Sequence, residues 1–197
     1  MRRALFIFLA FLTLLGIYFG AALLFFKTYY FTRVSSTFIE DHRYWSFIEA
    51  SERALSFSSP IGHEETLYLL GYQTLSLLDT DVDEEVARAL VTYYESWFDV
   101  RQPFSGGVFY TQGFSVAGQL RERLWDLYGA TDDFSKAEYY YLKGLALAPD
   151  KPDFLYDLFR LYLSHSAFSG DVRAVGGRIL GLWPDDIRVQ GILKSLE

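Results

Sequence analysis

The 197-residue chain contains no cysteine. This absence excludes disulfide bonds, cysteine-based metal sites and thiol nucleophiles, and it removes a residue type that could report the redox compartment. Histidine is scarce, because the chain has only His42, His63 and His165, which lie far apart in the sequence. Gly106 and Gly107 lack the lysine that follows the glycines of a phosphate-binding loop. We therefore expect no catalytic residue, no cofactor and no metal ion, and we predict that the protein is not an enzyme.

Basic residues are in the minority beyond the amino-terminal segment. All 25 acidic residues of the chain follow Lys27, whereas Arg2, Arg3 and Lys27 account for 3 of its 18 basic residues. Residues 28–197 therefore hold 15 basic against 25 acidic side chains, a formal charge of −10. Proteins that bind nucleic acid neutralise its phosphates with basic side chains, so we expect no nucleic-acid partner.

Apolar sequence is abundant at the start of the chain. Residues 4–26 contain no charged side chain and, at ~1.5 Å per residue, are long enough to cross the ~30 Å hydrocarbon layer as one helix. A cleaved secretory signal is the alternative, but the run exceeds the ~7–15 residues of a signal core. We therefore predict a retained transmembrane helix over about 4–26 within a membrane anchor over 1–34, with bilayer lipid as one partner.

The charges beside this helix bear on its orientation. Arg2 and Arg3 precede the apolar run, while Lys27 and Arg33 follow it, so the bias in positive charge is small. We expect a single-pass protein of the cell membrane, with its amino terminus in the cytoplasm and its soluble domain outside the cytoplasm.

The residues after the anchor, 35–197, show helical periodicity and little support for strands. Apolar side chains recur at spacings of three and four over about 38–57, 64–78 and 83–99. The first of these helices can be capped by one of three hydroxyl side chains, Ser35, Ser36 or Thr37. The sequence therefore predicts an all-α domain.

An irregular loop is expected over 101–112, where Pro103 and a glycine pair interrupt any helix. The segment is nevertheless aromatic, and it includes Phe109 and Tyr110. Inward packing of these rings is the default expectation, and their presentation to the ring faces of a sugar chain is the alternative. Phe109 and Tyr110 are therefore candidate binding residues.

A repeat with a period of 34 or 35 residues occupies the last third of the chain. The repeated residues are a leucine, a tyrosine and a helix-ending proline, namely Leu124, Tyr128 and Pro149, then Leu158, Tyr162 and Pro184. Between them, Ala137 and Gly144 supply small side chains where the two helices of a hairpin can approach closely. In the second copy, Val172 and Gly176 stand where a small and an aromatic residue are expected. This order of large, small and proline residues resembles a tetratricopeptide repeat.

The resemblance implies a stack of helical hairpins over residues 35–197. Its clearest repeats are expected at about 118–150 and 152–184. Asp185 and Asp186 can then cap a terminal helix within 185–196 that covers the end of the stack.

A second resemblance covers more of the chain. It is carried by a hydrophobic helix followed by ERALSF at 52–57, PIGHEET at 60–66, AEYYY at 137–141 and LALAP at 145–149. This order is similar to the last membrane helix and carboxy-terminal repeat region of bacterial O-antigen ligase-like and polymerase-like proteins. The multi-span catalytic part of that family is absent here. The resemblance implies a role in envelope polysaccharide biology, either as a detached partner of such an enzyme or as a fragment of one.

Two functional hypotheses follow. The first is a non-enzymatic, membrane-anchored scaffold that binds a protein partner on the concave surface of its hairpins, with candidate residues Tyr128, Tyr139, Tyr140 and Tyr162. The second is a glycan-binding accessory module, or the detached carboxy-terminal part of an O-antigen ligase-like glycosyl transfer enzyme. Several coplanar exposed rings would favour the glycan, whereas buried rings beside a polar groove would favour a peptide. We prefer the scaffold.

Overall fold

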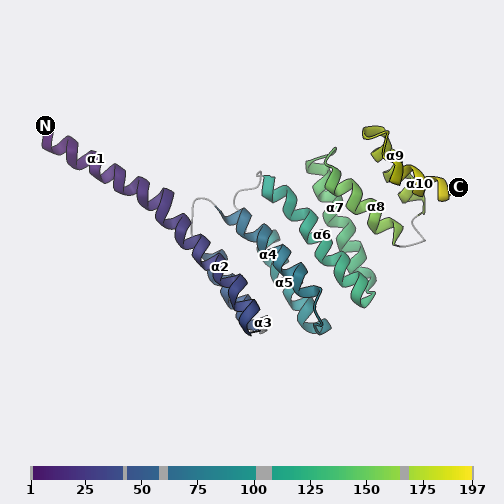
Figure 1. The fold of residues 1–197 in the computed structure, drawn as a ribbon, viewed down its shortest axis with the longest axis horizontal. Helices are drawn as coiled ribbons and strands as arrows, with labels where there is room; N and C mark the ends of the chain where they lie inside the picture. Colours follow the sequence, from purple (N-terminus) through teal and green to yellow (C-terminus); the bar gives the residue numbers. More distant parts are fainter. Residues whose placement is uncertain (1, 42–43, 58–61, 101–107, 165–168, 197) are drawn as a thin grey trace. The chain divides into compact units, whose positions relative to one another are not determined.

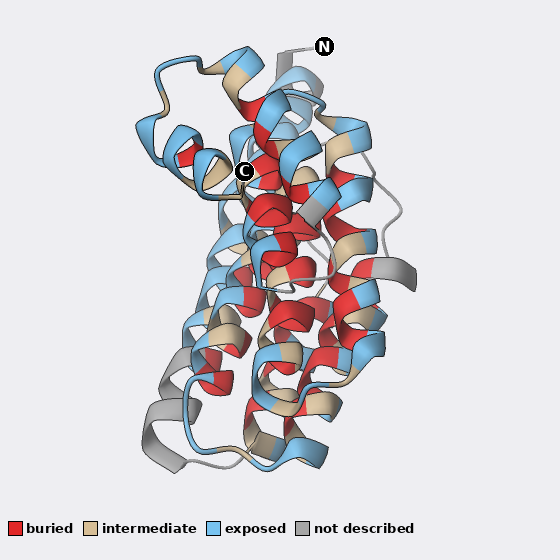
Figure 2. Cartoon of the chain, turned by 90° about the vertical axis from the view of Figure 1, so that its right-hand side faces the viewer, coloured by how far each residue is buried: buried red, intermediate tan, exposed pale blue. Residues whose placement is uncertain are grey.

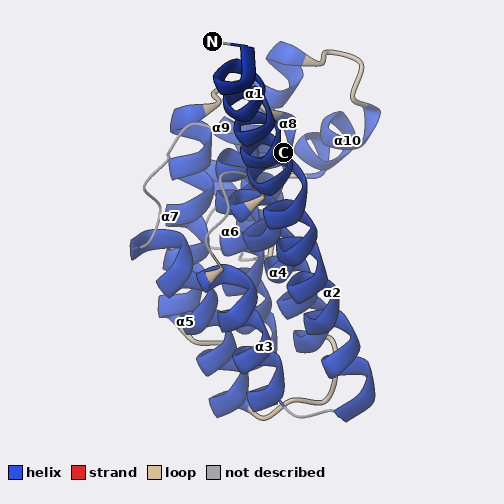
Figure 3. Ribbon diagram, turned by 90° about the vertical axis from the view of Figure 1, so that its left-hand side faces the viewer, coloured by secondary structure: helices blue, strands red, loops and turns tan. Residues whose placement is uncertain are grey.

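The computed structural model describes residues 2–41, 44–57, 62–100, 108–164 and 169–196, with the backbone alone described at 2–4, 35–41, 99–100, 108–109 and 169. These residues form helices and connections, and no strand occurs among them (Figure 3). The predicted all-α class is therefore confirmed. The chain divides into two compact units, Met1–Gln73 and Thr74–Glu197. This division differs from the predicted boundary at residue 34, which stays a prediction.

A long helix opens the first unit and runs from Arg2 to Asp41 as α1 (Arg2–Ile17), the π-helical turn η1 (Tyr18–Ala22) and α2 (Leu23–Asp41) (Figure 1). At η1 the Leu23 N–H bonds to the Tyr18 carbonyl, five residues earlier, which accommodates one extra residue without ending the helix. Among the described residues, one helical stretch, Leu5–Val34, is long and apolar enough to cross a membrane, and its apolar window is not buried within the chain.

The continuity of α2 overturns one predicted boundary. The helix passes through Ser35, Ser36 and Thr37, so the helix start predicted there is wrong. Hydroxyl side chains need not end a helix, because they can bond to the carbonyl four residues earlier. Thr28 and Thr32 do so in the preceding turns, with Oγ1 to carbonyl oxygen distances of 3.0 and 2.9 Å.

The next helix, α3 (Tyr44–Ser56), packs along α2. Its apolar face is buried at Phe47, Ala54 and Leu55, and Val34 of α2 is equally enclosed. The following helix, α4 (His63–Leu78), contains the boundary between the two units.

The second unit continues with α5 (Glu84–Val100), α6 (Val108–Tyr128), α7 (Thr131–Leu147), α8 (Pro152–Leu163), α9 (Ser169–Leu182) and α10 (Ile187–Ser195). Consecutive helices from α5 to α10 pack against one another, so that these helices lie side by side (Figure 1). Buried residues follow the inner sides of the helices, and exposed residues follow the outer sides (Figure 2).

Glycines allow close helix contacts in this unit, and two of them are at Gly118 and Gly144. A Cβ atom on Gly118 of α6 would lie 2.2 Å from Cε1 of Tyr141 in α7, and one on Gly144 of α7 would lie 2.1 Å from Cε1 of Phe154 in α8. Both rings are fully buried. Only glycine fits at these two positions in this packing, because any larger residue would overlap a ring that has no room to move.

The second half of the repeat uses a different combination of residues. Gly176 lies where an aromatic residue was expected, and a Cβ atom on it would lie 2.9 Å from Phe159 of α8 and 2.8 Å from Leu193 of α10. Gly176 therefore lies at a close contact of α9 with both α8 and α10. The ring at this contact comes from the neighbouring helix α8.

The predicted helix boundaries in this unit hold with one exception. The Asp186 carboxylate accepts the N–H groups of Arg188 and Val189, which confirms the predicted cap of the terminal helix. However, α6 begins at Val108, so the irregular loop predicted over 101–112 is wrong for 108–112, while 101–107 lie outside the described residues. No proline follows Pro103 in this segment, and the half-buried Tyr110 packs its ring against Phe98 and Phe114.

Candidate binding surface between α6 and α8

Polar side chains from α6 and α8 meet in the second unit. Along α6 they recur at helical spacing as Ser115, Gln119, Glu122 and Asp126, and along α8 they occur as Asp157 and Arg160. The two helices contact each other. Residues spaced by three and four share one helix face, so two polar stripes face each other across this contact.

One end of the surface is organised by Asp157. Ser115 Oγ donates to Asp157 Oδ2 at 2.7 Å, and Gln119 Nε2 lies 3.1 Å from Ser115 Oγ and 3.5 Å from the same carboxylate oxygen. Arg160 Nη2 lies 3.0 Å from Asp157 Oδ1. A buried carboxylate is thus held by neutral donors from α6 and by a cation from its own helix.

The other end is organised by Glu122. Arg160 donates through Nε and Nη2 to its two carboxylate oxygens, both at 2.8 Å, and the Tyr141 hydroxyl donates to Oε2 at 2.6 Å. Glu122 and Tyr141 are buried, whereas the Arg160 side chain is 55 % exposed. A two-pronged arginine–carboxylate pair fixes both position and orientation, so Arg160 is rigid although it reaches solvent.

The environment sets the protonation states of this cluster. Burial raises the pKa of the Asp157 carboxyl, although the Ser115 hydrogen bond and the Arg160 charge oppose the shift. Burial also raises the pKa of the Tyr141 hydroxyl well above its usual value, and the Glu122 charge adds to the effect. Hydrogen bonding to Glu122 raises the pKa of Arg160. Near neutral pH, Tyr141 and Arg160 therefore act as hydrogen-bond donors.

Gln119 and Arg160 are the members of this cluster that combine internal bonds with access to solvent. Gln119 is half-buried, and Arg160 uses Nε and Nη2 internally while its Nη1 forms no hydrogen bond with the residues that the structure describes. An external carbonyl or carboxylate could therefore accept a bond from Nη1 without breaking the Glu122 pair. The arrangement suits recognition of a polar segment.

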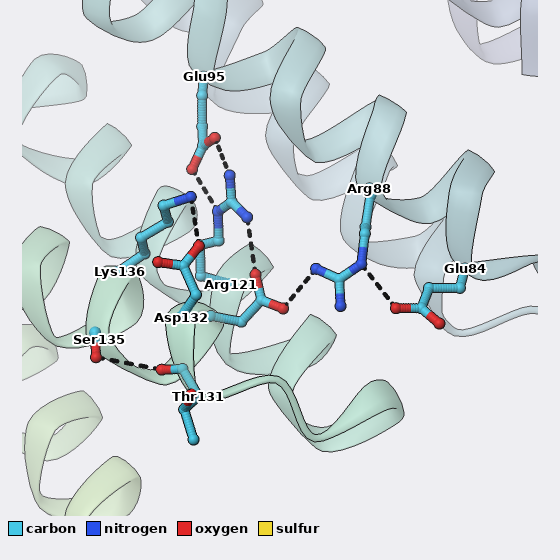
Figure 4. A network of polar contacts seen from close by, with 9 residues as sticks. Glu84, Arg88, Glu95, Arg121, Thr131, Asp132, Ser135 and Lys136 are labelled. Carbon is cyan, nitrogen blue, oxygen red and sulfur yellow. Dashed lines mark hydrogen bonds and ion pairs between the residues drawn. The ribbon is translucent and has the colours of Figure 1, made fainter.

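A second polar network lies among α5, α6 and α7 (Figure 4). Arg121 donates to Asp133 Oδ1 at 2.8 Å and to Glu95 Oε1 at 2.6 Å, while Arg88 Nη1 donates to Asp133 Oδ2 at 2.7 Å. Burial acts to lower the pKa of Arg121, but its bonds to Glu95 and Asp133 outweigh this effect and raise it. Arg121 and Asp133 are buried and mutually paired. The buried pair at the centre of this network therefore joins helices of the fold to one another.

Three of the candidate tyrosines are used in packing or internal hydrogen bonds. Tyr140 is 5 % exposed. Tyr162 is 6 % exposed, and its hydroxyl donates to Glu138 Oε1 at 2.6 Å. The half-buried Tyr128 donates to the Val82 carbonyl at 2.9 Å. Their predicted role in binding stays a prediction, but the ring faces of Tyr140 and Tyr162 are enclosed.

The other candidate rings differ from one another. Tyr139 is 52 % exposed, with Lys143 Nζ 5.3 Å from its ring centroid. The half-buried Tyr110 stacks on Phe98 with centroids 5.8 Å apart, so it packs inward at least on that face. The side chain of Phe109 lies outside the described residues. The structure therefore does not bring the six candidate rings together on one surface.

Sequence reasoning missed Gln119 and Arg160. The signal for α6 was present, because positions 115, 119, 122 and 126 place polar residues on one face of the helix. The meeting of that face with Arg160 depends on how α8 packs, which spacing within one helix does not report.

No group of three histidine, aspartate or glutamate side chains that could hold a metal ion occurs among the described residues. Comparison of the chain with protein-family models, with curated proteins and with solved structures found no match. The functional argument therefore rests on the geometry of the chain itself.

Proposed function

We propose that the protein is a membrane-anchored helical-repeat scaffold that binds an extended segment of a partner protein on the surface between α6 and α8. The observation that carries this proposal is the placement of Gln119 and Arg160, which come from two different hairpins and are held by buried partners. Polar groups fixed on rigid helices lose little freedom on binding, so their bonds contribute more fully to affinity. Stacked hairpins present such groups along an extended surface.

The packing of the second unit supports the tetratricopeptide interpretation. Leu124 and Leu158, the repeated leucines, are both buried, and Ala137 is fully buried where a small residue was expected. Gly144 lies against the ring of Phe154 in the next hairpin. Large residues between hairpins and small residues at close approaches are what a stack of this kind requires.

We propose further that the apolar helix is retained as an anchor. A signal sequence near the amino terminus would also be apolar, but cleavage after the small residues at 20–22 would remove the helix that leads into α2. The first turns of α2 belong to the folded unit, because Phe26 and Tyr30 pack against Phe57 with ring centroids 6.4 and 5.4 Å apart. Retention keeps this packed helix continuous with its membrane segment.

The placement of the domain rests on sequence. The charges of Arg2 and Arg3 favour a cytoplasmic amino terminus, and hence a domain outside the cytoplasm. The resemblance to O-antigen ligase-like proteins supports a partner that works in the assembly of surface polysaccharide. We therefore propose a membrane enzyme of that class as the protein partner.

The rings favour a peptide over a sugar chain. Tyr140 and Tyr162 are buried, and Tyr139 is an exposed ring with Lys143 over its face. A sugar-binding platform needs accessible ring faces. The polar groups between α6 and α8 instead match the backbone and side-chain groups of an extended peptide.

Site-specific photo-crosslinking tests the proposal in intact membranes. A photoreactive phenylalanine analogue replaces Gln119 in the full chain, and a matched control carries it at Ser135, an exposed position on α7. We expect a discrete protein adduct from position 119, none from position 135, and loss of the adduct when Arg160→Ala is added. Equal adducts from both positions, or no protein adduct from position 119, would contradict the proposed surface.

Amino-terminal sequencing of the membrane-bound protein tests the anchor separately. We expect the mature chain to begin at Met1 or Arg2. A mature terminus near Ala22 would show that the apolar helix is a cleaved signal.

A further inference from the structure

The first unit contains a joint where the end of α3 and the start of α4 meet the long helix. The joint consists of Leu24, Lys27, Tyr30, Phe57 and Gly62. The Phe57 ring packs on Tyr30, and the Phe57 carbonyl accepts a hydrogen bond from Lys27 Nζ at 3.1 Å. A Cβ atom on Gly62, which has a φ of +87°, would lie 3.7 Å from Leu24 Cδ1 and 3.8 Å from Lys27 Cγ. Phe57 and Gly62 therefore both lie against the same two turns of α2.

These two turns lie where the apolar run ends. Residues 4–26 measure ~34 Å at ~1.5 Å per residue, close to the ~30 Å thickness of the hydrocarbon layer. Leu24 is within the last turn of that run, and Tyr30 lies one turn beyond it. Groups packed against residues 24–30 therefore share the depth at which hydrocarbon gives way to lipid headgroups.

The partner of Lys27 is unusual for this depth. A lysine at the end of a transmembrane helix ordinarily extends its ammonium group toward lipid phosphates. Lys27 is instead 2 % exposed, and its ammonium group bonds to Phe57. The outward groups at this level are aromatic, because Phe26 and Tyr29 are each 47 % exposed. Aromatic rings settle at the boundary between hydrocarbon and water without requiring anionic lipid.

We infer that this joint lies in the headgroup layer of the bilayer and docks the first unit on the lipid surface. Phe57 and Gly62 are then held at the membrane surface, and α3 extends from there into water beside α2. The joint binds the headgroup and ester region of phospholipids. Aromatic side chains, and not a basic patch, recognise this region. The inference rests on the proposed membrane anchor and adds a second contact with the bilayer.

Spin-label depth measurements on the full chain test this inference. The chain has no cysteine, so each single-cysteine variant carries one label. We choose three exposed positions, Phe25→Cys on α2, Ser56→Cys at the end of α3 and Trp45→Cys at its start. Positions 45 and 56 are separated by ~16 Å along the helix axis, which the method resolves. The variants are reconstituted in phosphatidylcholine vesicles, and circular dichroism confirms that each has kept its helical content.

The measurement compares the access of a water-soluble nickel reagent and of oxygen to each label. We expect the label at 25 to be protected from nickel, the label at 56 to show intermediate access, and the label at 45 to be as accessible as in water. If position 25 is protected but position 56 is as accessible as position 45, the inference is overturned while the anchor stands. A label at 25 that nickel reaches freely overturns the anchor and the inference together. A label at 56 as protected as that at 25 would place the joint in the hydrocarbon and also overturn the headgroup assignment.

Discussion

Replacing Gly118 by alanine should destabilise the second unit, although alanine is the better helix former. A Cβ atom at this position would lie 2.2, 2.5 and 2.8 Å from Cε1, Cδ1 and Cζ of Tyr141. The Tyr141 ring is fully buried, and its hydroxyl is fixed to Glu122 at 2.6 Å. The ring therefore cannot turn away without losing packing or this hydrogen bond.

The magnitude follows from a matched control, Gly177→Ala in α9. Gly177 is also within a helix, and a Cβ atom on it would meet nothing within 4 Å. Both variants gain roughly 0.5–1 kcal/mol of helix propensity, so this gain cancels in their difference. The remaining difference is the overpacking of Tyr141, about 1–3 kcal/mol, and it lies at the upper end if the bond to Glu122 breaks.

Urea unfolding of the full chain in detergent micelles, followed by tryptophan fluorescence and circular dichroism, measures both variants. We expect Gly177→Ala to unfold at the same or a higher urea concentration than the unmodified chain, and Gly118→Ala to unfold at a lower one. Equal midpoints for the two variants would show that the helices tolerate a methyl group at Gly118, and the close-contact argument would then fail.

Three further predictions use the same unfolding assay. Ala137→Leu forces extra volume into a fully buried site and should lower the free energy of unfolding by about 1–3 kcal/mol. Ala146→Leu, at an exposed position of the same helix, should be nearly neutral. Equal losses of stability would refute the assigned packing position of Ala137. Arg121→Met leaves the buried Asp133 without one of its cations and should lower the free energy of unfolding by about 3–5 kcal/mol. An unchanged free energy of unfolding would show that the network contributes little to stability. Hydrogen bonds from the Tyr156 hydroxyl and the Val189 N–H lower the pKa of Asp186, so its stabilisation is present above the unfolded-state pKa of about 3.9 and is lost as pH falls through the folded-state value. The stability difference between the unmodified chain and Asp186→Ala should therefore be smaller at pH 3 than at pH 7, and a difference independent of pH would contradict the cap.

The helices that the sequence predicted correctly are those with local signals. The α4 and α5 helices show apolar spacings of three and four, and the carboxylate of Asp186 marks the start of α10. Such signals act within one or two turns, so they can be read without knowledge of the fold. The same reasoning placed a helix start at Ser35–Thr37, where hydroxyl side chains are compatible with both a cap and a continuing helix.

The candidate surface depended on contacts that the sequence does not encode locally. The sequence analysis selected aromatic residues as the candidate binding residues, but Tyr140 and Tyr162 are buried in the interior. Arg160 became a candidate only when α8 brought it against Glu122, 38 positions earlier in the chain. Long-range pairs of this kind follow from tertiary packing, and the periodicity of one helix does not specify them.

The affinity of the crosslinked partner for purified variants of the full chain tests the central claim most directly. Once identified by its adduct at position 119, the partner is titrated against the unmodified chain, Gln119→Ala, Arg160→Lys and the control Ser135→Ala. Arg160→Lys keeps the positive charge but loses the planar guanidinium group that forms two hydrogen bonds with Glu122. We predict that the Gln119 and Arg160 variants each bind about tenfold more weakly, a loss of about 1.4 kcal/mol, and that Ser135→Ala binds as the unmodified chain does. Unchanged dissociation constants for both Gln119→Ala and Arg160→Lys would contradict a binding surface between α6 and α8.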